Sequence, residues 1–128
     1  MNITFLKTVS DALRASWAAD TSNSSEWSED NPPMGQCAVT ACVLQDYLGG
    51  DILNVQATNK EGVGVSHYFN VIDGETIDLT KSQFRDGVIL SEPVLKSGNY
   101  ATTREYCLSF PSTNKRYELL ASKVAKLI

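Results

Sequence analysis

Apolar residues near the start of the chain recur every three or four positions, as they do on one face of a helix. From Ile3 to about Trp17 they are Phe5, Leu6, Val9, Leu13 and Trp17. Such a stripe predicts a helix that packs one side on the core. A second stripe predicts a final helix from about Asn114 to Leu127, and it consists of Tyr117, Leu120, Val124 and Leu127.

The pattern differs from Gln36 to Leu48, where apolar residues lie nearly all round the predicted helix. A helix of this kind is buried on every side, so we place it at the centre of the fold. Gly49 and Gly50 follow it, in the position where glycine commonly ends a helix. The stretch before it, roughly Asp20 to Gly35, is rich in Ser, Asn, Asp, Glu and Pro. It predicts an irregular segment, and irregular segments of this length are usually functional or disordered.

Three segments have the composition of strands: Ile52 to Ala57, His67 to Ile72, and Thr76 to Leu79. The last two are joined through Asp73-Gly74, a dipeptide that strongly favours a tight hairpin turn. A fourth extended segment is predicted at Tyr106 to Phe110, ended by Pro111. Helices that cover an antiparallel sheet predict an α+β fold.

Composition is that of one globular domain over residues 1–128, with 42% hydrophobic and 20% charged residues. The net charge of −4, without clustered Lys and Arg, argues against a nucleic-acid partner. Lys7, Asp11 and Arg14 interrupt the start of the chain, which therefore lacks the continuous apolar stretch of a signal peptide or membrane anchor. We expect a cytoplasmic protein with no membrane partner, and in that compartment its three cysteines are reduced.

Cys37 begins the predicted central helix, and this position favours a nucleophilic thiol. Unpaired backbone N–H groups and the positive end of the helix dipole stabilise a thiolate there. Gly35 allows close approach of a substrate, and the side-chain amide of Gln36 is a candidate to join the Cys37 N–H group in an oxyanion hole. Free cysteine also commonly serves as a small buried hydrophobe, which is the alternative for Cys37.

His67 is the sole histidine, so a thiol–imidazole mechanism must use it. If Asp73 and Gly74 form a two-residue turn, His67 and Asp78 project from the same sheet face as diagonal neighbours. The carboxylate would then orient the imidazole and stabilise the imidazolium that forms when Cys37 loses its proton. These residues predict a triad of Cys37, His67 and Asp78. The alternative for Asp78 is a solvated residue at a strand end.

Two other interpretations compete with the triad. Cys37, Cys42, Cys107 and His67 would make a zinc ligand set. Residues five apart on a helix are turned about 140° from each other, however, so Cys37 and Cys42 do not easily converge on one ion. We therefore expect no metal and no cofactor, with Cys42 and Cys107 as packing residues. The second alternative is a non-catalytic binding or interaction module, because a fold does not determine its function.

The runs WSEDNPPMGQCAVTACVLQDYLGGDIL and SHYFNVIDGETIDLTKSQF, which begin at Trp27 and end at Phe84, resemble the YunG-like family of small bacterial proteins. More distantly, Gly35-Gln36-Cys37 is similar to the Gly-Gln-Cys motif of transglutaminases, and Asp78-Leu79-Thr80 to the aspartate-containing strand of that superfamily. The resemblance implies a papain-like fold and a catalytic role for Cys37, His67 and Asp78. The expected activity is that of a thiol-dependent hydrolase, deamidase or acyltransferase, which attacks an ester, a small amide, a peptide or a protein substrate to form a thioester.

Overall fold

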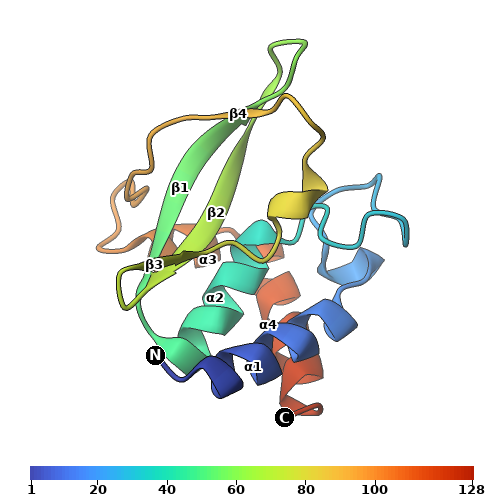
Figure 1. Cartoon of the computed structure of the whole chain (residues 1–128), viewed down its shortest axis with the longest axis vertical. Coiled ribbons are helices and arrows are strands. Elements are labelled where there is room, and N and C mark those ends of the chain that lie inside the picture. Colours follow the sequence, from blue (N-terminus) through green and yellow to red (C-terminus); the bar gives the residue numbers. More distant parts are fainter.

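The computed structural model describes residues 1–128 and has an α+β architecture, which confirms the predicted fold class (Figure 1). The helices are α1 (Ile3–Ser16), α2 (Cys37–Leu48), α3 (Thr103–Leu108) and α4 (Pro111–Ala125), with the 3₁₀ turns η1 (Ala19–Thr21) and η2 (Lys81–Gln83). The strands are β1 (Asp51–Thr58), β2 (Gly64–Ile72), β3 (Glu75–Ile77) and β4 (Ile89–Leu90).

The four strands form one antiparallel sheet in the order β3-β2-β1-β4. Ile72 pairs with Glu75, so the β2–β3 loop has the two predicted residues. Asp73 and Gly74 both have positive φ values, 51° and 79°, as a type I′ turn requires. The ladder ends at Ile77, so β3 is shorter than predicted and Asp78 lies directly after it.

Helix α2 is buried at the centre of the molecule, as its composition predicts. Its buried residues occur on most sides of the helix and are Cys37, Val39, Thr40, Ala41, Cys42, Val43 and Leu44. One core cluster joins residues of four elements: Val9 of α1, Val43 of α2, Ile72 of β2 and Leu120 of α4. Figure 1 shows α1, α2 and α4 grouped at one end of the sheet. This packing fixes the direction of α2 and therefore where Cys37 lies relative to β2.

The predicted strand at Tyr106–Phe110 is wrong, because this part of the chain forms α3 and the start of α4. Thr102 caps α3 by accepting a hydrogen bond from the backbone N–H of Glu105 at 3.1 Å. Arg104 holds α3 against α2 by donating to a backbone carbonyl of that helix at 2.9 Å. Pro111 begins α4 rather than ending a strand, since its missing N–H group costs no hydrogen bond in the first helical turn.

The irregular segment predicted before α2 folds back on itself and ends beside Cys37. The Ser22 hydroxyl donates to the carbonyl of Met34 at 2.7 Å, and the N–H of Asn23 donates to the carbonyl of Gly35 at 3.0 Å. These bonds join the two ends of the segment. It therefore forms a closed loop that borders the start of α2.

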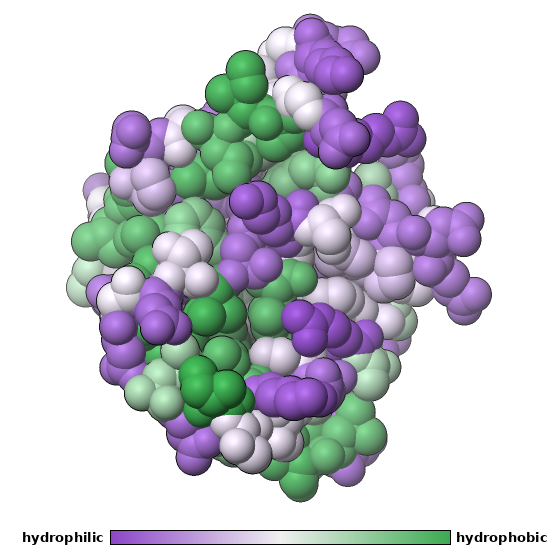
Figure 2. Space-filling view, viewed as in Figure 1, coloured by the Kyte–Doolittle hydropathy of each residue, from purple (hydrophilic) through white to green (hydrophobic).

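Hydrophobic side chains are exposed along β4 and the segment after it. Ile89 and Leu95 are 72% and 65% exposed, and Figure 2 shows hydrophobic surface over this upper part of the molecule. β4 is an edge strand of only two residues, so little side-chain packing covers it. None of the helices combines the length and the apolar character that a membrane span requires.

Candidate active site

Cys37 is the first residue of α2, and the chain leading to it determines where its thiol lies. Gly35 has a φ of 71°, a conformation that favours glycine, and a Cβ at this position would clash with the Ser22 hydroxyl. The N–H groups of Cys37 and Ala38 form no hydrogen bond within the chain, because the first turn of a helix offers them no carbonyl. Cys37 itself is 8% exposed. Its thiol therefore lies at a helix N-terminus and remains within reach of a small molecule.

His67 and Asp78 contact each other directly, in the geometry that the hairpin predicts. The distance from His67 Nε2 to Asp78 Oδ2 is 2.8 Å. His67 is completely buried on β2, and the side chain of Asp78 is 11% exposed just after β3. The second oxygen of Asp78, Oδ1, is buried without a hydrogen-bond partner. The imidazole is thus the principal partner of this carboxylate.

Cys37 is a second neighbour of the same imidazole ring, close enough to raise the pKa of His67. Asp78 occupies Nε2 of the ring. The three residues predicted to act together are therefore neighbours in the structure.

The protonation of His67 reflects these two neighbours. Burial by itself lowers the pKa of His67, since it penalises the charged ring. The hydrogen bond with the Asp78 carboxylate and the neighbouring Cys37 outweigh that effect and raise the pKa of His67 to about 9. The site therefore favours an imidazolium at neutral pH, which is the partner that a thiolate requires.

Aromatic rings hold the imidazole in place. The ring of Phe84 meets the ring of His67 edge to face, with centroids 4.8 Å apart and an interplanar angle of 83°. The ring of Phe69 lies on the same strand, with its centroid 6.3 Å from that of His67. These contacts exclude water from the ring and restrict its rotation, so the imidazole is positioned before any ligand binds.

Gln83 is a further residue of the site, and sequence reasoning gave it no role. Its Nε2 lies 3.5 Å from His67 Nδ1, and its Oε1 accepts a hydrogen bond from the N–H of Gly35 at 3.2 Å. Gln83 also lines the cleft beside Cys37. It follows Asp78 in the run DLTKSQF, but a glutamine after a strand has no distinctive local signal. Only its contacts with Gly35 and His67 identify it.

The side chain of Gln36, the candidate oxyanion-hole residue, has a different environment from the one expected. It is completely buried, and its Nε2 donates to the backbone carbonyl of Ala18 at 3.0 Å. Gln36 is not among the residues that line the cleft. Its side chain therefore connects the start of α2 to the end of α1 instead of facing the cleft with Cys37.

The other two cysteines are buried in the same core cluster as Cys37, and Cys107 also lines the cleft. Burial raises the pKa of Cys42 to about 12 and that of Cys107 to about 11. Cys107 lies on helix α3, not on the strand that was predicted for it. The structure brings together no group of three or more His, Cys, Asp or Glu side chains suited to a metal ion, so the zinc ligand set does not form.

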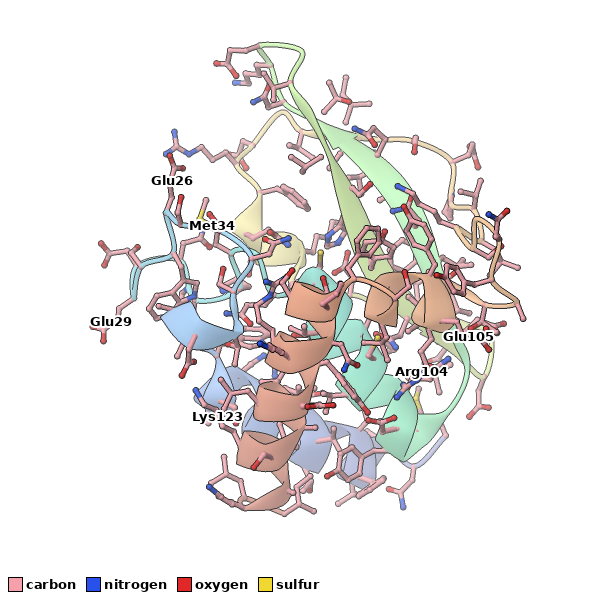
Figure 3. The ribbon with its side chains drawn as sticks, turned by 180° about the vertical axis from the view of Figure 1, so that it is seen from behind. Glu26, Glu29, Met34, Arg104, Glu105 and Lys123 are labelled. Atoms are coloured by element: carbon pink, nitrogen blue, oxygen red, sulfur yellow. The ribbon has the colours of Figure 1, made fainter.

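Cys37 lines a cleft of about 620 Å³, and His67 and Asp78 lie behind it. Its walls come from the loop before α2, strand β2, η2, α3 and α4, and its lining residues are Asn23, Ser24, Met34, Gly35, Cys37, Ala38, Val65, Ser66, Tyr68, Gln83, Phe84, Lys96, Tyr106, Cys107, Phe110 and Thr113. In Figure 3, Met34 lies on one side of the N-terminal end of α2. Helix α3, which carries Arg104 and Glu105, lies on the other side. A ligand in this cleft would lie against the end of α2 that carries Cys37.

The fold and this cluster define a class of protein: a small α+β protein in which a cysteine at a cleft lies beside a buried histidine–aspartate pair. The family model described as YunG protein matches residues 5–128, and the chain therefore belongs to the YunG family. It is similar to uncharacterized protein YunG of Bacillus subtilis (strain 168), with 38% identity over 73 residues. This match covers 57% of the chain and 57% of the Bacillus protein, so it spans little more than half of that relative. No solved structure matches the chain.

Proposed function

We propose that the protein is a thiol-dependent hydrolase or acyltransferase that acts on an amide or ester through Cys37, His67 and Asp78. One observation carries this proposal: a completely buried imidazole lies 2.8 Å through its Nε2 from the Asp78 carboxylate and has the Cys37 thiol as its other neighbour. A histidine that served only in packing would need neither neighbour. The arrangement instead meets the requirements of a nucleophile, a base and a group that orients the base.

In the proposed reaction, His67 takes the thiol proton and the Cys37 sulfur attacks the carbonyl carbon of the substrate. As the tetrahedral intermediate collapses, the C–N or C–O bond breaks and His67 returns the proton to the leaving amine or alcohol. This leaves a thioester on Cys37. Water or an amine then attacks the thioester while His67 accepts its proton. The C–S bond breaks, the acid or the new amide leaves, and His67 returns the proton to the Cys37 sulfur. Asp78 accepts a hydrogen bond from Nε2 throughout, which keeps Nδ1 available to Cys37.

Two hydrogen-bond donors are available for the oxyanion of the intermediate. One is the backbone N–H of Cys37 at the start of α2, and the other is the side-chain amide of Gln83, which lines the cleft. We assign Gln83 the role first expected of Gln36, because the Nε2 of Gln36 is bonded to Ala18. Donors of this type typically contribute about 2.7–4 kcal/mol to transition-state stabilisation.

We further propose that the fold is a variant of the papain-like fold. A cysteine begins a central helix that packs on an antiparallel sheet, and the sheet hairpin supplies the histidine and the aspartate in that order. These features support the papain-like interpretation. The competing function is that of a non-catalytic binding module built on the same fold.

Selective alkylation tests the proposal. Limited iodoacetamide treatment of the native protein near neutral pH, read out by peptide mass spectrometry, should label Cys37 before Cys42 and Cys107. Burial raises the pKa of both other thiols and keeps them protonated. The variant His67→Ala should slow the labelling of Cys37, whereas the exposed substitution Lys126→Ala should not.

A panel of activated esters and amides then separates the enzyme from the binding module. We expect turnover by the wild-type protein and none by Cys37→Ala, with circular dichroism showing that both are folded. Equal labelling of the three cysteines, or turnover that survives Cys37→Ala, would contradict the proposed function. Binding of a ligand without any Cys37-dependent turnover would favour the binding module instead.

A further inference from the structure

We infer that the substrate of this site carries a negatively charged group, and that Lys96 binds it while the rest of the cleft holds an apolar part of the same molecule. The inference rests on the proposed function, because it names the substrate class for the Cys37 site. Its basis is the position and surroundings of Lys96, which the proposed reaction itself does not use.

Lys96 is the one charged side chain among the sixteen residues that line the cleft. The chain as a whole has a net charge of −4, so a cleft whose single charged side chain is positive departs from the overall charge of the protein. Lys96 takes part in none of the salt bridges of the protein. Its charge therefore has no carboxylate partner within the chain.

Several contacts hold Lys96 in the wall of the cleft. Its Nζ donates to the Ser66 hydroxyl at 2.9 Å, and it lies 5.7 Å from the centre of the Tyr106 ring. Its backbone N–H donates to the Thr103 hydroxyl at 3.1 Å, which ties this part of the chain to α3. A lysine ammonium has three hydrogens, and one is used by Ser66. The remaining hydrogens can reach a bound anion without a change in the position of the side chain.

The walls around this ammonium are mainly apolar. Nine of the sixteen lining residues are hydrophobic, and Val65, Tyr68, Phe84, Tyr106 and Phe110 are the larger ones. A cleft with apolar walls screens a charge less than bulk water does, so the attraction between Lys96 and an anion is strengthened there. The same walls bind an apolar chain or ring. Together they fit an amide or ester whose apolar body ends in an anionic group such as a carboxylate.

The test compares two thiol reagents that differ only in charge. Iodoacetamidohexanoate carries a carboxylate at the end of an apolar chain, and its terminal primary amide is the uncharged analogue. The rate of Cys37 alkylation by each reagent is measured by peptide mass spectrometry, and the ratio of the two rates is divided by the same ratio for N-acetylcysteine. We expect the wild-type protein to prefer the carboxylate by roughly tenfold, equivalent to about 1.4 kcal/mol. The preference should decrease as salt is added.

Three variants assign the preference to Lys96. Lys96→Met should remove it without slowing the reaction with the uncharged reagent, and Lys96→Arg should retain it. Lys126→Met is the matched control, because it removes an exposed lysine at the end of α4 and changes the net charge equally. It should leave the preference unchanged. If Lys126→Met lost the preference for the carboxylate reagent to the same extent, the preference would come from the overall charge of the protein. That result would overturn the inference.

The outcomes separate this inference from the proposed function. If Cys37 reacts in a manner that depends on His67 but shows no preference for the carboxylate, the charge requirement is wrong and the proposed reaction stands. If Cys37 reacts no faster than N-acetylcysteine with either reagent and ignores His67→Ala, the proposed function fails, and the substrate class fails with it.

Discussion

At the scale of single residues, the contact between His67 and Asp78 governs the protonation of the imidazole. Buried histidines are usually neutral, because burial penalises the charged ring. Here the carboxylate 2.8 Å from Nε2 and the neighbouring Cys37 reverse that preference and raise the pKa of His67 to about 9. A histidine with this pKa is mostly protonated at neutral pH. It can therefore form an ion pair with a thiolate.

Titration of His67 by NMR tests this balance directly, since one histidine gives one set of imidazole signals. We expect a pKa of about 9 in the wild-type protein. Asp78→Asn should lower it, because the substitution removes the negative charge and leaves burial, which lowers the pKa. Cys37→Ala should also lower it. The control Asp51→Asn, at an exposed position at the start of β1, should leave it unchanged.

A pKa for His67 that stayed the same in Asp78→Asn would contradict the proposed role of the carboxylate. It would indicate that Asp78 contributes to the hairpin and not to the state of the imidazole. Loss of the folded state would be visible in the same spectra through the other resonances, so a structural failure of the variant would not be mistaken for a shift.

At the scale of elements, the loop before α2 depends on Gly35. Its φ of 71° is strained for any other residue, and an added Cβ would lie 2.6 Å from Asn23 Oδ1 and 2.8 Å from Ser24 N as well as on the Ser22 hydroxyl. The loop can therefore close against the start of α2 only with glycine at this position. The N–H of Gly35 also holds Gln83, so the same residue connects the loop, η2 and the site.

Gly35→Ala should destabilise the protein more than the matched substitution Gly62→Ala. Gly62 has a similar φ of 83°, but a Cβ there would meet no atom within 4 Å. Gly62→Ala should thus report the cost of the backbone conformation alone, about 1 kcal/mol. Gly35→Ala should add a steric cost of about 1–3 kcal/mol. Urea unfolding of the two variants measures the difference, and equal losses would show that the close approach at Gly35 does not matter.

At the scale of the whole molecule, the site makes stability depend on pH. The pKa of His67 in the folded protein is raised from 6.5 to about 9. The folded state therefore binds more protons than the unfolded state between these values, and the free energy of unfolding decreases as pH rises through this range. The contribution of His67 is fully present below about pH 6.5 and is lost as pH passes about 9.

Urea unfolding at a series of pH values from about 6 to above 9 should reveal this loss. The unfolding free energy of the wild-type protein is compared with that of His67→Gln at each pH. Groups that titrate equally in both proteins cancel in the difference. We expect the difference in unfolding free energy to shrink steadily across the interval. A difference that stayed constant with pH would show that His67 stabilises the fold through packing alone.

The fold was predictable where neighbouring residues encode it. Periodic apolar residues predicted α1 and α4, an apolar run ended by two glycines predicted α2, and Asp73-Gly74 predicted the two-residue turn that brings His67 and Asp78 together. The exception was Tyr106–Phe110, whose aromatic and apolar residues suggested a strand. Its helical structure follows from the Thr102 cap and from Arg104, which bonds to α2. The cap is local, but the contact with α2 depends on a partner more than fifty residues away.

The sequence by itself determined most of the local elements of this protein and the candidate site residues: a cysteine that begins a helix, one histidine, and an aspartate brought near it by the hairpin. Only the tertiary structure decided which distant residues join them. Gln83 reaches Gly35 and His67, Gln36 turns to Ala18, and Lys96 bonds to Ser66 beside the cleft. Backbone periodicity and turn type follow from residues adjacent in the chain. Contacts between distant side chains follow instead from how α2, the sheet and the loops pack, and no local pattern of residues specifies that packing.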